Sequence, residues 1–225
     1  MRVARSKPIE SAPKVHTSSR VRPRKYHHGD LRRAILDVAL EVLAKEGAEA
    51  LTLREVARRL GVTSAAPYHH FADKEAILAA VAEEGFLALV EAMKPPPSAK
   101  KPIARLRSQG MGYVKFAVEH PAHYRVMFGR LVDIPKYPSL HAAADQAFEA
   151  LVGSIVAAQA AKAIRPGDAV EHALLAWSTV HGLAMLWIDG ALRGPTSHGC
   201  EAPVGAPSIE ALAEAASEML IRGLA

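Results

Sequence analysis

Cysteine is almost absent from this chain of 225 residues, since Cys200 is the only one. One cysteine permits neither an intrachain disulfide nor a four-cysteine zinc site, and it is typical of a reducing compartment. We therefore expect a cytoplasmic protein. Long hydrophobic runs are also missing. The strongest candidate, residues 174–188, has 15 residues between Glu171 and Asp189 and is too short to span a bilayer, so the sequence predicts no membrane span.

The residue patterns of catalytic and metal sites are missing as well. No serine or cysteine lies in a motif that would activate it as a nucleophile, and there is no glycine-rich phosphate loop. The neighbours in the pairs His27-His28 and His69-His70 point about 100° apart on a helix, which prevents them from sharing a metal ion. We therefore expect no enzyme activity, no cofactor and no metal site.

Positive charge is concentrated near the N-terminus. Residues 1–74 contain 15 basic and 8 acidic residues, whereas the rest of the chain contains 13 and 15. Residues 1–25 hold eight Lys or Arg, three prolines and few apolar side chains, which favours a disordered basic arm and excludes a signal peptide. A basic head on a nearly neutral body is typical of a protein that binds a polyanion, although a solvated charge run has the same composition.

Apolar residues beyond the arm recur with the period of α-helices, and no segment alternates convincingly as a β-strand does. The sequence therefore predicts an all-α protein. Asp30, Asp73 and Ser208 are suited to cap helices, and the Gly- and Pro-rich stretch 193–207 is expected to be a surface loop. The expected helices cover about 31–46, 53–60, 63–71, 74–93, 102–119, 121–127, 139–163, 167–189 and a final segment from 209.

A stretch in the basic third of the chain has the pattern of two short helices joined by a tight turn. Thr52 and Glu55 match a capping box, in which the threonine hydroxyl accepts from an amide of the first turn and the glutamate reaches back. Gly61 ends the first helix, and the second is expected from Thr63 to Phe71. Its length of roughly 12 Å suits end-on entry into the major groove, which makes the pair a candidate helix-turn-helix. The core between the two helices is expected to contain Val56, Ala57, Leu60, Val62 and Phe71.

This stretch closely resembles the DNA-binding domain of TetR-type transcriptional regulators. The resemblance rests on Leu51 to Thr63, which reads Leu-Thr-Leu-Arg-Glu-Val-Ala-Arg-Arg-Leu-Gly-Val-Thr, and on residues 67–71 and 73–75. It covers about residues 26–90. The lead-in at residues 25–32 also looks like the start found in one subset of that family.

The resemblance implies which residues contact DNA. Thr52, Tyr68 and Lys74 match positions that usually touch phosphates, while residues 63–66 and His69 match positions that usually face bases. Pro67 is a departure, since many relatives have a larger aliphatic residue there, and its missing amide is expected to tighten or tilt the recognition helix. The expected DNA-binding residues are Thr52, Arg54, Thr63, Ser64, Ala65, Ala66, Tyr68, His69, His70 and Lys74.

The remainder of the chain has the pattern of a dimerisation body. The helix expected over residues 167–189 is apolar almost all round, so with the final helix it can form half of a four-helix bundle across a two-fold axis. A homodimer supplies two heads about 34 to 36 Å apart, as the reading of a palindrome requires. Trp177 with His181-Gly182 is also similar to the Trp…His-Gly signature of a C-terminal domain found in the same TetR subset.

An apolar set in the middle helices is a candidate pocket, although core packing explains each member equally well. The resemblance implies that a small hydrophobic or amphipathic effector binds in this region. His181 lies on an apolar helix, where a histidine satisfied within the core is more common than a ligand contact. The candidate ligand-binding residues are Tyr113, Phe116, Tyr124, Met127, Phe128, Phe148, Trp177 and His181.

These patterns together predict an arm at residues 1–25, a three-helix helix-turn-helix domain at 26–75 and a helical-bundle ligand-binding and dimerisation domain at 76–225. The expected function is that of a transcriptional repressor of the TetR type, released from a palindromic operator on double-stranded DNA by its effector. The alternative is a non-enzymatic helical binding protein whose basic arm contacts RNA or an anionic membrane without sequence preference. Selectivity for a short palindrome distinguishes the two.

Overall fold

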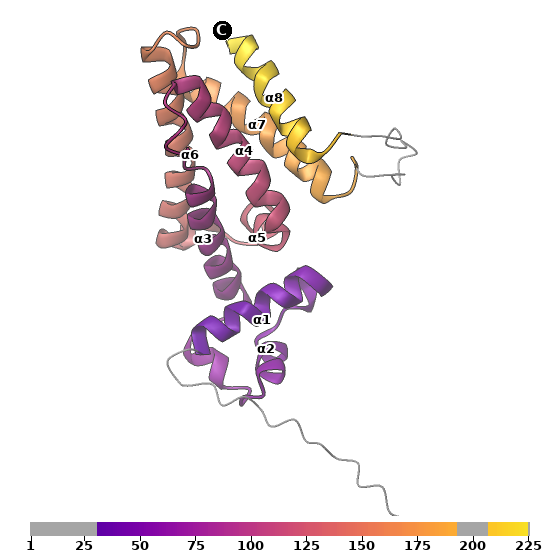
Figure 1. The fold of residues 1–225 in the computed structure, drawn as a ribbon. Helices are drawn as coiled ribbons and strands as arrows, with labels where there is room; N and C mark the ends of the chain where they lie inside the picture. The colour runs from indigo at the N-terminus through magenta and orange to yellow at the C-terminus, as the bar shows by residue number, and fades with distance from the viewer. Residues whose placement is uncertain (1–30, 193–206, 225) are drawn as a thin grey trace, which may run out of the picture.

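The computed structural model describes residues 31–192 and 207–224, and every regular element in these ranges is helical, which confirms the predicted all-α fold. The expected basic arm, the Asp30 cap and residues 193–206 of the expected loop lie outside the described residues. Figure 1 shows a small head and a larger body joined by one helix. The α-helices are α1 Leu31–Glu46, α2 Leu53–Leu60, α3 Lys74–Ala92, α4 Pro102–Glu119, α5 Pro121–Phe128, α6 Pro138–Ala160, α7 Ala169–Ile188 and α8 Ile209–Leu224, and the short 3-10 helices are η1 Ala48–Ala50, η2 Ala66–His69 and η3 Ile134–Lys136.

The head is built around α1 and α2. The hydroxyl of Thr52 caps α2 by accepting a hydrogen bond from the Glu55 amide at 3.1 Å. The helix ends at Gly61, whose φ of 67° lies in the left-handed region that favours glycine. The Glu55 carboxylate, which a full capping box would direct back to residue 52, instead accepts from Arg58 and Arg59, so only half of the predicted box forms. Of the expected core, Val56, Ala57, Leu60 and Phe71 are buried and Val62 is half-buried.

The recognition segment differs from its predicted form. In place of an α-helix from Thr63 to Phe71, the structure has a turn followed by the four-residue 3-10 helix η2, so that prediction is wrong. The physical reason is Pro67, which has no amide hydrogen to donate to the Thr63 carbonyl. That carbonyl accepts from the Ala66 amide at 3.0 Å instead, which is the tighter 3-10 pattern. The Pro67 ring is fully buried and anchors the segment to the head.

Helix α3 carries the chain from the head into the body. Asp73 caps it by accepting from the Ala76 amide at 2.8 Å. The helix packs against α1 on the side of the head and against α4, α5 and α6 in the body, and its buried residues therefore lie on several faces. The boundary predicted after residue 75 falls inside α3. One buried hydrophobic cluster runs from Val42 in the head to Tyr113 in the body, so the two parts share a continuous core.

The body is a bundle in which α4 packs against α6, α7 and α8, while α3 packs against α5 and α6 nearer the head (Figure 1). A second buried cluster, which includes Leu106, Ile155 and Leu224, fills the end of the body farthest from the head. This layering surrounds the middle of α4 with apolar side chains. In the described ranges, no helix is long and apolar enough to cross a bilayer.

Candidate nucleic-acid interface and ligand cavity

The residues expected to contact DNA lie on α2, the turn after it, η2 and the start of α3, at the free end of the head (Figure 1). Tyr68 shows their accessibility most clearly, because 53% of its side chain is exposed on a segment held from behind by buried Pro67 and Phe71. An exposed ring on an anchored segment adds little to the core and is available to a partner. Ala66 and Lys74 are half-buried, and the exposed members are Thr52, Arg54, Thr63, Ser64, Ala65, Tyr68, His69 and His70.

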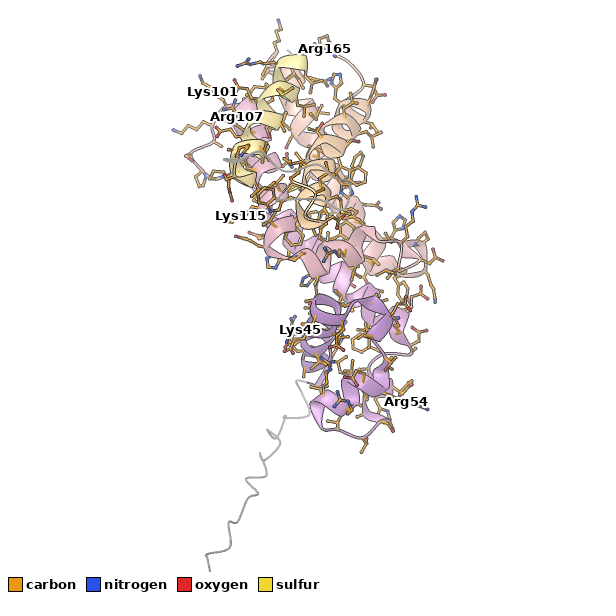
Figure 2. The ribbon with its side chains drawn as sticks, turned by 90° about the vertical axis from the view of Figure 1, so that its right-hand side faces the viewer. Lys45, Arg54, Lys101, Arg107, Lys115 and Arg165 are labelled. Carbon is orange, nitrogen blue, oxygen red and sulfur yellow. The ribbon has the colours of Figure 1, made fainter. Side chains whose placement is uncertain are left out.

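The arginines of α2 divide into paired and unpaired groups. Arg58 and Arg59 both bind the Glu55 carboxylate, and their hydrogen bonds lower the pKa of Glu55 to about 2. Arg59 also pairs with Glu46. Arg54 forms no ion pair with any described residue, and Figure 2 shows it near the free end of the head. Arg54 is therefore the α2 arginine whose charge is available to a phosphate.

A cavity of about 270 Å³ lies in the body between α3, α4, α5, α6, α7 and α8. Five of the eight candidate ligand-binding residues line it, whereas Phe116, Tyr124 and His181 do not. Periodicity predicted helices over about residues 74–93 and from residue 209 without indicating which neighbours their apolar side chains meet, so the residues that these helices contribute were missed. The five that line the cavity are Tyr113, Met127, Phe128, Phe148 and Trp177, and the missed residues of α3, of its C-cap and of α8 are Phe86, Leu89, Met93, Ser217, Leu220 and Ile221.

His181 and Tyr124 belong to a hydrogen-bonded cluster beside the cavity. His181 Nδ1 lies 2.7 Å from the Tyr124 hydroxyl and 2.9 Å from the Tyr113 hydroxyl, and Trp177 Nε1 donates to Tyr113 at 3.0 Å. Burial lowers the pKa of His181 and raises that of Tyr113 to about 12. At neutral pH the cluster therefore combines a neutral imidazole with protonated phenols, and its polar atoms satisfy one another.

Two polar groups of the cavity wall, both on α4, have no hydrogen-bond partner among the described residues. Gln109 is only 5% exposed, and its Oε1 accepts no hydrogen bond. The buried Nε of Arg107 donates none. Sequence reasoning missed both, because a basic residue and an amide on an amphipathic helix are ordinarily solvated. Only their place in the cavity wall distinguishes them.

The loop between α5 and α6 connects the cavity to the head. Ile134, in η3, lines the cavity. Two residues later, Lys136 Nζ lies 2.9 Å from Oε2 of Glu75, and the Asp133 amide donates to Oε1 of the same carboxylate at 3.3 Å. The Lys136 contact lowers the pKa of Glu75. Because Glu75 follows Lys74 at the start of α3, the loop joins a cavity wall to the helix start that carries one of the residues expected to contact DNA.

Helices α7 and α8 present an apolar face that no described residue covers. Leu175 and Leu186 on α7 are each 50% exposed, and Met219 on α8 is 75% exposed. Between the two leucines, Gly182 has no described atom within 4 Å of the position that a Cβ would take. A contiguous apolar face on neighbouring helices is typical of a surface that packs against another protein surface.

Two family models match the chain. The model described as "Bacterial regulatory proteins, tetR family" matches residues 35–81, and the model described as "Tetracyclin repressor-like, C-terminal domain" matches residues 106–202. The first match contains the recognition segment. The second contains most of the cavity wall, including Arg107, Gln109 and Trp177.

Individual proteins are similar to the chain over different lengths. A solved protein of unknown function from Rhodococcus sp. RHA1 is 36% identical with a TM-score of 0.76, and the match covers 90% of this chain and 99% of that one. Tetracycline repressor protein class C from Escherichia coli is 50% identical over 52 residues, which are 23% of this chain and 24% of the repressor. The uncharacterized HTH-type transcriptional regulator YobS from Bacillus subtilis is 27% identical over 105 residues, which are 47% of this chain and 55% of YobS. The matches thus span about half or less of the two curated relatives. From the two family models taken together, the chain belongs to the TetR family of bacterial transcriptional regulators.

Proposed function

We propose that this regulator is a homodimeric repressor that binds a palindromic operator and leaves it when a small molecule enters the cavity. The observation that carries the proposal is the exposed segment of residues 63–70, which buried Pro67 and Phe71 anchor from behind. Short side chains at Thr63 and Ser64 permit close approach to base edges. Lys74, at the start of α3, and the exposed Tyr68 hydroxyl are suited to phosphate oxygens.

A dimer is needed because one segment of this length makes too few base contacts for a specific site. The apolar face of α7 and α8 supplies the surface for it. When this face meets its symmetry mate, the exposed side chains of Leu175, Leu186 and Met219 leave water together, and Gly182 allows the helices to approach closely. The four helices then form the bundle that places two heads on one side of DNA.

Release from DNA follows from a ligand that binds one spacing of the two heads better than another. The described route runs from Ile134 in the cavity wall to Lys136 and Asp133, and from these two to Glu75 at the start of α3. A hundredfold loss of operator affinity requires a differential of about 2.7 kcal/mol between the two spacings. That differential lies near the upper end of the coupling energies of about 1 to 3 kcal/mol that are usual for allosteric proteins.

The test is selection of binding sites from a random duplex library with the full chain, followed by affinity measurements at several salt concentrations. We expect one short palindrome to be enriched and the affinity to fall steeply with salt. Lys74→Ala is expected to weaken binding to all DNA and to reduce the salt slope by about 1, whereas Ser64→Ala changes the preference at one or two positions.

Lys115→Ala is the matched control, because it removes one exposed charge from α4, outside the head (Figure 2). It is expected to change neither affinity nor preference. The proposal fails if no palindrome is enriched, or if Lys74→Ala and Ser64→Ala lose equal affinity on selected and random duplexes. Either result would show that the protein binds DNA without sequence preference.

A further inference from the structure

The unpartnered polar groups of the cavity wall restrict what the cavity is built to hold. Apolar side chains form nearly all of this wall, and Tyr113 and Trp177 satisfy each other through a hydrogen bond. Gln109 Oε1 and Arg107 Nε remain without any partner among the described residues. A buried polar group without a partner is unfavourable, and native proteins leave few of them. The side chains of Arg107 and Gln109, which line the cavity and carry these groups, are therefore the natural attachment points for the polar part of a ligand.

The charge around these groups favours an anion. Residues 95–119, which include all of α4, contain five basic residues, and their single acidic residue, Glu119, pairs with Lys115 at the C-terminal end of the helix. Figure 2 shows three of the basic residues, Lys101, Arg107 and Lys115, along one edge of the body. Arg107 forms no ion pair with any described residue, although it lines the cavity. A positive potential at a mostly apolar cavity attracts anions and raises their local concentration.

We propose that the cavity takes an amphipathic carboxylic acid, whose apolar chain fills the space between the helices and whose carboxylate is held by Arg107 with Gln109 as the second polar contact. A carboxylate accepts a charge-assisted hydrogen bond from a guanidinium. A 180° rotation of the Gln109 amide brings Nε2 to the place of Oε1, and Nε2 then donates a hydrogen bond to the carboxylate. This inference rests on the proposed ligand-controlled function and adds to it the chemical class of the ligand.

The cavity volume indicates the length of the ligand's apolar chain. At roughly 30 Å³ for each non-hydrogen atom, a space of about 270 Å³ admits a ligand of at least nine or ten such atoms. Octanoate, which has ten non-hydrogen atoms and whose eight carbons include that of the carboxylate, is therefore the first probe. Octan-1-ol is its neutral counterpart, with a similar length and no charge.

The experiment measures binding of octanoate and octan-1-ol to the full chain by isothermal titration calorimetry and by the shift of Tm, with hexanoate and decanoate as length controls. We expect octanoate to bind at least tenfold more tightly than octan-1-ol and to raise Tm. Arg107→Gln is expected to weaken octanoate about tenfold to a hundredfold and to leave octan-1-ol unchanged. Gln109→Leu is expected to weaken octanoate by a smaller factor.

Arg105→Gln is the matched control, because Arg105 is an exposed residue of the same helix, carries the same charge and does not line the cavity. It is expected to change octanoate binding less than about twofold, since exposed charges are screened. The unliganded Arg107→Gln protein should unfold at the same temperature as the wild type or higher, because the substitution removes a buried unpartnered donor. A lower Tm accompanied by equal losses for acid and alcohol would show that Arg107 supports the fold only, and would overturn the proposal.

The remaining outcomes separate an error in the assigned ligand class from an error in the proposed function. Equal affinity for acid and alcohol, or an equal loss in Arg105→Gln, overturns the assignment of a carboxylate. Failure of all three acids to bind also overturns it. Each of these results leaves binding of the unliganded protein to its selected palindrome intact, whereas failure of the proposed function appears as loss of that DNA selectivity in the absence of any acid.

Discussion

Pro67→Ala tests whether one buried proline sets both the stability of the head and the shape of the recognition segment. The substitution removes two methylene groups from a fully buried ring, which costs about 1.6 kcal/mol of burial free energy. It also raises the conformational entropy of the unfolded chain, which lowers the free energy of unfolding by a further 0.4 to 1 kcal/mol or so. The new amide can donate to the Thr63 carbonyl, and such a hydrogen bond returns about 1 kcal/mol. The expected net loss is about 1 to 1.5 kcal/mol in the free energy of unfolding.

The same substitution is expected to change DNA recognition. With an amide at residue 67, the segment can wind as an α-helix, and the wider turn rotates Tyr68 and His69 relative to Ser64. We therefore expect the preferred bases within each half-site to change, while the spacing of the half-sites stays the same because the dimer is untouched. Urea unfolding measures the loss of stability, as a lower midpoint at an unchanged slope. Selection from a random duplex library measures the change in preferred bases.

Pro102→Ala is the control for Pro67→Ala. Pro102 is the first residue of α4, where the missing amide hydrogen needs no partner, and it is only half-buried. Its replacement should cost little beyond the added freedom of the unfolded chain, about 0.4 to 1 kcal/mol, and should leave the DNA preference unaltered. The reasoning about Pro67 is refuted if Pro67→Ala is as stable as the wild type, or if it selects the same bases.

Three further predictions concern the body and its link to the head. Burial lowers the pKa of both His181 and His123, so the stability they contribute is present above their unfolded pKa, about 6.5, and is lost as pH falls from there through the folded values. The urea midpoint should therefore drop between pH 7.5 and 5, and His181→Gln should reduce the drop; an undiminished drop would contradict the role given to His181. Lys136→Met breaks the 2.9 Å contact with Glu75. Because both groups are partly exposed, the free energy of unfolding should change by less than about 1 kcal/mol. The effect of bound ligand on DNA affinity should shrink about two- to fivefold. Equal ligand effects in the wild type and this variant would exclude the loop as the route. Leu186→Glu should convert the dimer to a monomer in light scattering, whereas Leu131→Glu, which alters a partly exposed leucine outside α7 and α8, should not; a variant that stays dimeric would place the interface elsewhere.

The arrangement of elements along the chain was predictable because its signals are local. Thr52, Gly61 and Asp73 define helix ends through their own side chains or backbone freedom, and the structure places α2 and the start of α3 where these residues indicate. The exposed face of residues 63–70 was likewise foreseen from the polarity of the segment. Its backbone form was foreseen only in part: Pro67 was expected to tighten or tilt the helix, but not to replace it by a turn and a short 3-10 helix.

The cavity shows where local signals end. Tyr113, Phe128 and Trp177 were named from apolar periodicity, and they do line it, but the same pattern also named Tyr124 and His181, which satisfy each other in the core instead. A helical period tells which face of a helix is apolar, and it does not tell which distant helix covers that face.

The sequence by itself determined the helical class, the helix ends that capping residues mark, and the exposed, polar face of residues 63–70, because each depends on residues within a few positions of one another. Only the tertiary structure decided which side chains surround the cavity, and that Arg107 and Gln109 line it while Arg107 Nε and Gln109 Oε1 have no hydrogen-bond partner among the described residues. It also decided that the wall residue Ile134 lies two positions from the lysine bound to Glu75. These relations depend on how α3, α4, α6, α7 and α8 pack, and packing sums many weak contacts between residues far apart in the chain.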